Sequence, residues 1–351
     1  MYKCLHEFMD YHARVNGEKI FANDDGQKLS YAEVGVRINK IADQLNAMKL
    51  KPGDRVSLLG KNSVNLISMY LACSRLGVVP VGINYRLTSQ EAQFIIEDAG
   101  ARCLFADEEF IDAIDKENIL IDVDDSKVPL PIICLHGSHP GFPLLDQWIL
   151  QEVPRHVSPE IDSSDVLNQM YTSGTTGLPK GVLLTHYSVV SNAFQTSIAS
   201  GYTFRPGQEM LVVAPMYHAA GLMTCLVGMM QGMHLVIHRD YDPVKVVTTL
   251  SEQRISAVTL VPAMLQFILS QVPGINDINF PDLELIYYGA SPMSVDLLKR
   301  SMKVFECDFC QGYGQTENNS VLTILSPSDH HHALAHHPDL LNACGRAVLN
   351  T

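Results

Sequence analysis

Residues 55–105 read RVSLLGKNSVNLISMYLACSRLGVVPVGINYRLTSQEAQFIIEDAGARCLF, and short apolar runs alternate in this stretch with segments of helical spacing. The apolar runs predict three strands, at residues 55–59, 78–81 and 102–105. The segments between them are long enough to hold helices. Because strands joined through helices need crossover connections, the stretch predicts a parallel sheet of the α/β class.

Capping residues mark where the helices of this stretch begin and end. A helix over residues 64–76 is expected to end at Gly77, since glycine readily adopts the left-handed conformation of a helix C-terminus. Thr88 and Glu91 form the pattern of a capping box, which predicts the start of the next helix, and Gly100 is expected to end it. These boundaries agree with the strands predicted on either side.

The same alternation returns in the second half of the chain. Residues 107–165 lack it and hold an acidic stretch, so they predict a connection between two α/β units. Further strands are expected near residues 209–213, 234–237, 256–260, 284–288 and 307–310. The sequence thus predicts two doubly wound, mostly parallel β-sheets flanked by helices, in units of residues 1–165 and 166–330. In such folds, ligands bind at the carboxyl ends of the strands.

Composition limits the partners of the chain. The 351 residues contain 38 Asp and Glu against 25 Lys and Arg, a formal net charge of −13. A nucleic-acid backbone would be repelled by this charge, so no nucleic-acid partner is expected. The first residues carry charges and histidines where a signal peptide has an apolar core. Together with the eight cysteines, they predict reduced thiols and a cytoplasmic protein.

Residues 210–238 contain no formally charged side chain and are therefore compared with a membrane span. A spanning helix needs about 20 mainly apolar residues, and glycines and polar residues interrupt this run. A buried helix, a turn at Gly232 and a short strand at 234–237 are predicted instead. No transmembrane segment is expected, which leaves peripheral contact as the form that any membrane association would take.

The stretch Met170–Gly181, MYTSGTTGLPKG, carries the strongest chemical signal. Its glycines are Gly174, Gly177 and Gly181, and its hydroxyl groups belong to Thr172, Ser173, Thr175 and Thr176. Glycines let a backbone expose successive N–H groups, and Lys180 adds a positive charge, so the stretch predicts a polyphosphate-binding loop. It is not the GxxxxGK[ST] loop of kinases and GTPases, because Pro179 and Lys180 stand in the wrong places. The alternative interpretation is a surface loop rich in Gly, Ser and Thr.

This loop resembles the phosphate-loop signature of the adenylate-forming superfamily: acyl-CoA synthetases, aryl-CoA ligases, peptide-synthetase adenylation domains and firefly luciferase. Further segments resemble other elements of that superfamily in the same order: LSYAE at 29–33, PMYH at 215–218, YGASPM at 288–293, QGYGQTE at 311–317 and CGR at 344–346. Two positions depart from its pattern, since Tyr288 stands where glycine is usual and Ser291 is inserted. The resemblance covers essentially the whole chain and is greatest to medium- and long-chain fatty acyl-CoA ligases.

The resemblance implies an acid–thiol ligase that uses ATP, Mg²⁺ and coenzyme A. A carboxylate attacks the α-phosphate of ATP, which gives an acyl-adenylate and pyrophosphate, and a thiol then takes the acyl group. The thiol is usually that of coenzyme A and in some members belongs to a carrier protein. Three hypotheses stay open: a fatty acyl- or aryl-CoA ligase, an adenylate former that loads a carrier-protein thiol, and a non-catalytic acyl- or nucleotide-binding fragment.

The resemblance also implies roles for single residues. Lys180 would contact the departing pyrophosphate, Thr316 the α-phosphate, and Glu317 with Thr172 would hold Mg²⁺, a cation that prefers oxygen ligands. The implied catalytic residues are Lys180, His218, Thr316 and Glu317. The implied nucleotide-binding residues are Thr172, Ser173, Gly174, Thr175, Thr176, Gly177, Lys180, Gly289, Ala290, Ser291, Gln311, Gly312, Tyr313, Gly314, Gln315 and Thr316. The plain alternatives are an exposed loop carboxylate for Glu317 and a core tyrosine for Tyr313.

The implied acyl pocket consists of Tyr217, His218, Gly221, Tyr288, Gly289 and Gly314. His218 would line this pocket and gate thiol entry, although a lone histidine between apolar residues is most often a core histidine. Acetyl-CoA synthetases carry a tryptophan in place of Gly314, so the glycine is expected to leave space for a medium- or long-chain acid. Residues 216–218 contain no acid to pair with an ammonium group, which disfavours amino acid substrates.

By resemblance, the chain is a large N-terminal domain. Residues 331–351 would begin a truncated third, barrel-like subdomain, and the small C-terminal domain with its lysine would be absent. The chain alone is therefore expected to have little or no activity.

A histidine-rich segment lies between Pro327 and Pro338. Its histidines are His330, His331, His332, His336 and His337. Imidazoles can bind a metal ion. The flanking prolines favour an exposed loop without a metal.

Overall fold

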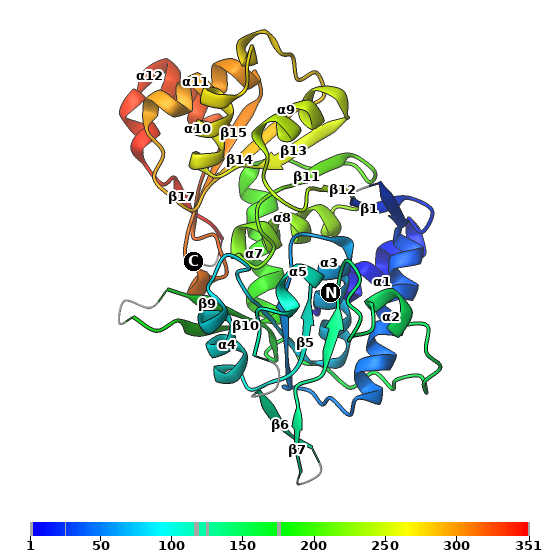
Figure 1. Cartoon of the computed structure of the whole chain (residues 1–351). Helices are drawn as coiled ribbons and strands as arrows, with labels where there is room; N and C mark the ends of the chain where they lie inside the picture. Colours follow the sequence, from blue (N-terminus) through cyan, green and yellow to red (C-terminus); the bar gives the residue numbers. More distant parts are fainter. Residues whose placement is uncertain (1–2, 25, 116–118, 124–125, 174–176, 350–351) are drawn as a thin grey trace. The chain divides into compact units, whose positions relative to one another are not determined.

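The computed structural model describes residues 3–24, 26–115, 119–123, 126–173 and 177–349 (Figure 1). Contacts divide the chain into two compact units. Unit 1 comprises Met1–Glu18, Tyr31–Val190 and Met216–His218. Unit 2 comprises Lys19–Ser30, Ser191–Pro215 and Ala219–Thr351.

In the described ranges, unit 1 is built on a six-stranded sheet with strand order β10-β9-β4-β3-β5-β8. Neighbouring strands are parallel except β9 and β10, which are antiparallel. The strands are β3 (Arg55–Leu59), β4 (Val79–Gly82), β5 (Ala101–Ala106), β8 (Ile132–Cys134), β9 (Val166–Thr172) and β10 (Lys180–Thr185). A separate hairpin pairs β6 (Leu120–Val123) with β7 (Ser126–Pro129).

The helices of unit 1 confirm the boundaries predicted from capping residues. They are α1 (Leu5–Val15), α2 (Tyr31–Ala47), α3 (Val64–Leu76), α4 (Ser89–Asp98), α5 (Glu108–Ile111) and α6 (Leu145–Trp148). Gly77 ends α3 in the left-handed region, with φ 69°. Thr88 and Glu91 form the expected capping box of α4. The next helix, α7 (His186–Ser200), begins in unit 1 and continues in unit 2.

Unit 2 holds, within the described residues, a nine-stranded sheet of order β17-β16-β15-β14-β13-β11-β12-β1-β2. Its strands are β1 (Ile20–Asp24), β2 (Gln27–Ser30), β11 (Glu209–Val212), β12 (His234–Ile237), β13 (Ile255–Thr259), β14 (Leu285–Gly289), β15 (Asp308–Tyr313), β16 (Thr323–Leu325) and β17 (Arg346–Ala347). The central strands are parallel, and β2, β16 and β17 pair antiparallel at the two edges. The five strands predicted for this half are all present.

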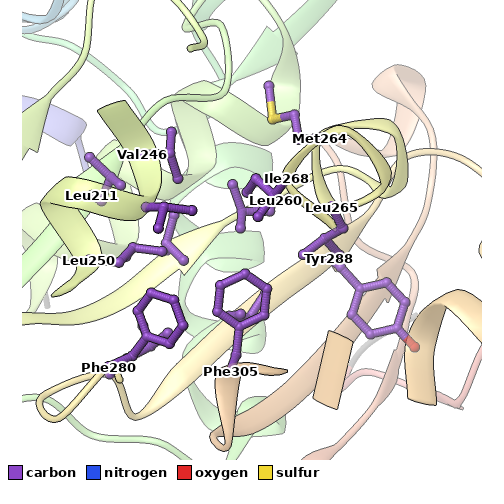
Figure 2. Close-up of a cluster of buried hydrophobic side chains, with 14 of the residues drawn as sticks. Leu211, Val246, Leu250, Leu260, Met264, Leu265, Ile268, Phe280, Tyr288 and Phe305 are labelled. Carbon is purple, nitrogen blue, oxygen red and sulfur yellow. The ribbon is translucent and has the colours of Figure 1, made fainter. Parts of the chain in front are cut away.

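Helices of unit 2 pack against this sheet around an apolar core (Figure 2). The helices of unit 2 are α8 (Ala219–Met230), α9 (Pro243–Glu252), α10 (Pro262–Gln271), α11 (Val295–Phe305) and α12 (Pro327–His336), with the short helices η1 (Ile275–Asp277), η2 (Thr316–Asn318) and η3 (Pro338–Asn342). Of the longer helices, α9, α10, α11 and α12 contribute side chains to this core. Leu260, Leu265 and Phe305 are almost fully buried in the core. Burying one such side chain stabilises the folded protein by about 1.5–3 kcal/mol relative to leaving it exposed.

The compact units do not follow the boundary predicted near residue 165. Residues 166–190 group with unit 1, because β9 pairs with β4 and β10 with β9. Residues 19–30 group with unit 2, because β1 pairs with β12. Residues 331–351 also group with unit 2, and the barrel-like subdomain stays a prediction.

The uncharged stretch forms the elements expected of it. Helix α8 covers 12 residues, Gly232 turns the chain with φ 74°, and β12 follows. A search of the described residues for helices long and apolar enough to cross a membrane finds none.

The histidine-rich segment is a helix, so the prediction of an exposed loop is wrong. Ser326 caps α12 by accepting the N–H of Asp329, whose carboxylate accepts the N–H of Ser326 in return. Pro327 stands at the first position of the helix, where proline is favoured. His330 is fully buried, whereas His331, His332, His336 and His337 are exposed.

Candidate functional site

The predicted phosphate loop connects β9 to β10 in unit 1. Thr172 and Lys180 are direct partners in the antiparallel register, which brings their side chains to the same face. Ser173, Gly177 and Lys180 are exposed, and Gly177 has φ 99°. Gly174, Thr175 and Thr176 lie outside the described residues. The hairpin therefore holds a hydroxyl and an ammonium group side by side where the loop leaves the sheet.

Gly181 keeps the base of this loop compact. A Cβ at this position would lie 2.3 Å from Nε2 of Gln169 and 3.1 Å from Cζ of Tyr171. Gln169 donates to the hydroxyl of Tyr171 at 3.0 Å, and that hydroxyl donates to Asp98 at 2.5 Å. These contacts tie the loop base to the end of α4.

Met216–His218, the end of the PMYH element, group with unit 1. Tyr217 is buried, and its ring lies 4.5 Å from that of His218. His218 itself is exposed, so it is not the core histidine of the plain alternative. The protein atoms around the ring partly desolvate it, and this desolvation, with secondly the charge of Arg86, lowers the pKa of His218. The imidazole is therefore neutral at physiological pH.

The YGASPM and QGYGQTE elements lie together in unit 2 because β14 and β15 are parallel neighbours. Gly289 pairs with Gly312, and a Cβ on Gly289 would lie 2.1 Å from the carbonyl oxygen of Gly312. The next residue, Ala290, has φ 63°, which is strained for a residue with a side chain. Backbone strain of this kind clusters at functional sites, and Ser291 follows it as an exposed residue.

The turn after β15 presents the remaining predicted residues. Gln311, Gly312 and Tyr313 are the last three residues of β15, and 52% of Tyr313 is exposed, so it is not a core tyrosine. Gln315 precedes η2, which contains Thr316 and the exposed Glu317. Seven predicted nucleotide or metal residues, those at positions 311–317, thus lie on one short segment of unit 2.

Asn192 of α7 holds this turn and was not found from the sequence. It is buried, its Nδ2 donates to the carbonyl of Val321 at 2.7 Å, and its Oδ1 accepts the N–H of Val321 at 3.1 Å. The turn is closed further by the N–H of Leu322, which donates to Tyr313 at 2.7 Å. Nothing in the local pattern of α7 singles out Asn192, because Thr196 and Ser200 of the same helix are buried polar residues as well.

The surroundings of Gly314 differ from the expectation that this glycine leaves space for an acyl chain. A Cβ on Gly314 would lie 1.9 Å from the carbonyl oxygen of Ser320 and 3.0 Å from the nitrogen of Val321. The space in front of this glycine is therefore filled by backbone and is not open to an acyl chain along that direction. The glycine is required by the turn itself.

Two further residues of the predicted acyl pocket have structural contacts. Gly221 lies where a Cβ would be 2.1 Å from the carbonyl oxygen of Pro215, so it lets α8 start directly after that segment. Tyr288 is 3% exposed and belongs to the apolar core of unit 2 (Figure 2). Its side chain lies among core residues, and nothing in the described contacts places it in a pocket.

The two residues predicted to hold Mg²⁺ belong to different units, Thr172 to unit 1 and Glu317 to unit 2. The described residues contain no cluster of three or more His, Cys, Asp or Glu side chains suited to a metal ion. The exposed carboxylate of Glu317 fits Mg²⁺, which commonly takes one or two carboxylates together with waters and substrate phosphates.

Comparison with known proteins identifies the family to which the chain belongs. The AMP-binding enzyme family matches residues 9–351. The chain belongs to this family. A fatty acid–[acyl-carrier-protein] ligase, ScoC of Streptomyces coeruleorubidus, is 33% identical over 308 residues, 87% of this chain and 57% of that protein. The long-chain-fatty-acid–CoA ligase FadD13 of Mycobacterium tuberculosis is 33% identical over 302 residues, 86% of this chain and 58% of that protein.

Solved structures of AMP-binding enzymes share the fold. The inhibitor-bound N-terminal domain of FACL13 from Mycobacterium tuberculosis matches with a TM-score of 0.85 and 29% identity, covering 99% of this chain and 83% of that chain. The predicted α/β fold and the resemblance to adenylate-forming enzymes are thereby confirmed. The chain spans less than three fifths of the length of the two curated relatives.

Proposed function

We propose that this chain forms the nucleotide- and acid-binding part of an ATP-dependent acid–thiol ligase. The observation that carries the proposal is the family match over residues 9–351, in a chain whose phosphate-loop hairpin pairs Thr172 with Lys180. A carboxylate oxygen attacks the α-phosphorus of ATP, the bond to the bridging oxygen breaks, and pyrophosphate leaves. A thiolate sulfur then attacks the acyl carbon, and AMP leaves.

The residues of the chain contribute charge and position to the first step. Lys180 would neutralise the departing pyrophosphate, and Thr316 would donate its hydroxyl to the α-phosphate. Glu317 would hold Mg²⁺, which supplies positive charge to the phosphates when bound, and Thr172 stays a predicted ligand of the same ion. In such reactions the protein mainly positions groups and stabilises charge, which suits residues fixed at strand ends.

A medium- or long-chain fatty acid is the substrate that we propose. Two relatives in the comparison carry fatty acid ligase names. Helix α8, which follows His218 in the sequence, is rich in buried Met and Leu, and methionine adapts to flexible aliphatic groups. Because backbone atoms fill the space in front of Gly314, this glycine no longer supports a long acyl chain. The proposed chain length therefore rests on the relatives and on the side chains of α8.

The acyl acceptor has two candidates. Coenzyme A is the first, and FadD13 is named for it. A carrier-protein thiol is the second, because the relative from Streptomyces coeruleorubidus is named an acyl-carrier-protein ligase. Thioester formation with each acceptor in turn would separate the two. A cytoplasmic location is proposed with either acceptor, since all eight cysteines are free thiols.

Calorimetry tests the nucleotide site directly on this chain. ATP with Mg²⁺ is expected to bind, and Lys180→Ala is expected to weaken the binding. Lys299→Ala, which removes an exposed lysine on α11, serves as the control. If millimolar ATP gives no heat with the folded chain, the nucleotide-site assignment is wrong.

A further inference from the structure

Residues Met216–His218 belong to a different compact unit from the residues on either side of them. They group with unit 1, whereas the chain on both sides of them, up to Pro215 and from Ala219, groups with unit 2. These three residues belong to no helix or strand, so no backbone ladder holds them in place. Their place must be fixed by specific contacts with unit 1.

Asn62 supplies the polar contact. Its Oδ1 accepts the backbone N–H of Met216 at 2.8 Å, although the two residues are 154 positions apart in the sequence. Asn62 is 2% exposed and lies in the loop after β3, at the carboxyl end of the sheet of unit 1. A buried N–H that loses its acceptor costs about 1–3 kcal/mol, so this bond specifies where Met216 lies.

The loop that carries Asn62 is itself anchored. Asp107, which follows β5, accepts the N–H of Lys61 at 2.9 Å through Oδ2. Gly60 packs so closely on this carboxylate that a Cβ there would lie 2.9 Å from Oδ1. The acceptor for Met216 is therefore held by the end of a neighbouring strand and is not a mobile surface group.

Gly82 and Tyr85 supply the packing. A Cβ on Gly82 would lie 3.2 Å from Cα and 3.3 Å from Cβ of Tyr217, and 2.6 Å from the hydroxyl of Tyr70. The ring of Tyr85 meets that of Tyr217 edge-on at 5.4 Å. The missing side chain at Gly82 thus leaves the space that the backbone of Tyr217 fills.

We propose that Asn62 is a positioning residue for His218, and that Asn62, Gly82 and Tyr85 together form a seat for residues 216–218. The seat fixes the backbone before His218, and so fixes where the imidazole lies. This inference rests on the proposed function for its effect on catalysis, because the resemblance to adenylate-forming enzymes predicts that His218 lines the acyl pocket. The contacts themselves do not depend on that function.

Hydrogen exchange and histidine titration test the seat without any activity. In the 351-residue chain, Asn62→Leu removes the acceptor at similar size, and Asn62→Asp keeps an acceptor oxygen. Protection of the Met216 amide is expected to fall about tenfold in the leucine variant and to return in the aspartate variant. The pKa of His218 is expected to rise toward its ordinary value in the leucine variant, because the ring moves away from the protein atoms that partly desolvate it. The aspartate variant is judged by amide exchange alone, since a carboxylate would itself raise the pKa of a nearby histidine.

Asn65→Leu is the matched control for that experiment. Asn65 lies in the first turn of α3, three residues after Asn62, and its hydrogen bonds in the described structure go to the carbonyl of Leu135 and to Arg37. The control is expected to lower stability while it leaves the Met216 amide and the His218 titration unchanged. Equal exchange and titration in wild type and Asn62→Leu would overturn the seat.

A second variant tests the packing of Gly82 against Tyr217. Gly82→Ala in a Tyr70→Phe background adds a methyl group against Tyr217 and removes the hydroxyl that would otherwise block it. The His218 titration is expected to shift in the same direction as in Asn62→Leu. A folded double variant with the wild-type His218 titration would contradict the role of Gly82.

Steady-state kinetics on the full-length protein then test the consequence. In Asn62→Leu, kcat/KM for the carboxylic acid is expected to fall at least tenfold, while KM for ATP stays within about twofold, because Asn62 holds the segment that carries His218 and is not one of the predicted nucleotide-binding residues. A general loss of folding would change both constants together. If kcat/KM for the acid is unchanged although the Met216 amide is released, His218 does not need the seat and the positioning role is wrong.

Failure of the proposed function gives a different result. A wild-type protein that forms no adenylate from octanoate or palmitate contradicts the ligase assignment. The exchange and titration data alone then decide whether the seat holds residues 216–218.

Discussion

The hydroxyl of Tyr288 lies 2.9 Å from Nε2 of His330, in the interior of unit 2. The other ring nitrogen of His330, Nδ1, lies 2.8 Å from the carbonyl oxygen of Ser326. A carbonyl can only accept, so Nδ1 carries the proton and Nε2 accepts the hydroxyl of Tyr288. Figure 2 shows the Tyr288 ring at the margin of the apolar core with its hydroxyl pointing out of the labelled cluster. The pair ties β14, which leads into Gly289, to α12.

Tyr288→Phe is predicted to destabilise the protein by about 1–3 kcal/mol, because it leaves a buried acceptor on His330 without a donor. The packing of the ring is kept. Chemical denaturation of the wild type and the variant measures the difference in the free energy of unfolding. Tyr313→Phe removes the hydroxyl of a ring that is 52% exposed and is expected to change stability by less than about 0.5 kcal/mol. Equal losses in the two variants would contradict the hydrogen bond.

Local patterns in the sequence predicted the local structure well. The strand and helix boundaries of residues 55–105 followed from apolar runs and capping residues, and both units confirm the α/β alternation. The error at α12 had a local cause, because two flanking prolines were given more weight than the capping pattern of Ser326 and Asp329. A proline at the first helical position favours a helix.

Contacts between distant segments could not be found in this way. Asn62 meets Met216 across 154 positions, and Asn192 meets Val321 across 129. The obstruction in front of Gly314 is likewise a backbone carbonyl from a turn that the sequence does not describe. Motif resemblance predicts the residues of the site, whereas Asn62 and Asn192, which hold segments that carry some of them, leave no pattern of period two or 3.6.

Acid is predicted to destabilise unit 1 through His6 and His186. Burial, and secondly Arg75, lower the pKa of His6 to about 4, and burial, and secondly His6, lower that of His186 to about 4. Both residues are neutral in the folded chain, and each takes up a proton near pH 6.5 when unfolded. The free energy of unfolding is therefore expected to fall as the pH drops from about 6.5 to 4, by up to about 1.4 kcal/mol per pH unit for each histidine.

His186→Asn separates this contribution from those of other groups. Nδ1 of His186 accepts the N–H of Leu5 at 3.3 Å, and an asparagine oxygen can take over that bond without titrating. Denaturation at pH 7.5, 6 and 5 measures the free energy of unfolding. In the variant, this free energy is expected to fall less steeply with decreasing pH, because up to one proton fewer is taken up on unfolding. An identical pH dependence in both proteins would exclude His186 as a source of the acid sensitivity.

Lys180→Ala and Glu317→Ala are each predicted to lower adenylate formation by the full-length protein about 100- to 1000-fold. Loss of one charge-stabilising contact in a reaction of this kind has that effect. Pyrophosphate release with octanoate measures the rate. Lys299→Ala and Glu252→Ala remove exposed charges of the same sign from α11 and α9 and are expected to keep the wild-type rate. Losses below about threefold for both site variants would contradict the assigned roles.

Gly314→Ala is predicted to lower activity on all acids alike rather than to change the preferred chain length. The added Cβ would lie 1.9 Å from the carbonyl oxygen of Ser320, so the turn that carries Thr316 and Glu317 must shift. A displacement of about 1 Å in such groups can cost about 100-fold in rate. A series of kcat/KM values from acetate to palmitate tests this on the full-length protein. Gly141→Ala, whose methyl group would meet only His139 at 3.5 Å, is the control and is expected to behave as wild type. If Gly314→Ala, or the larger Gly314→Trp, abolishes the use of octanoate but spares that of acetate, the glycine faces the acyl chain after all, and the turn moves aside to admit the side chain.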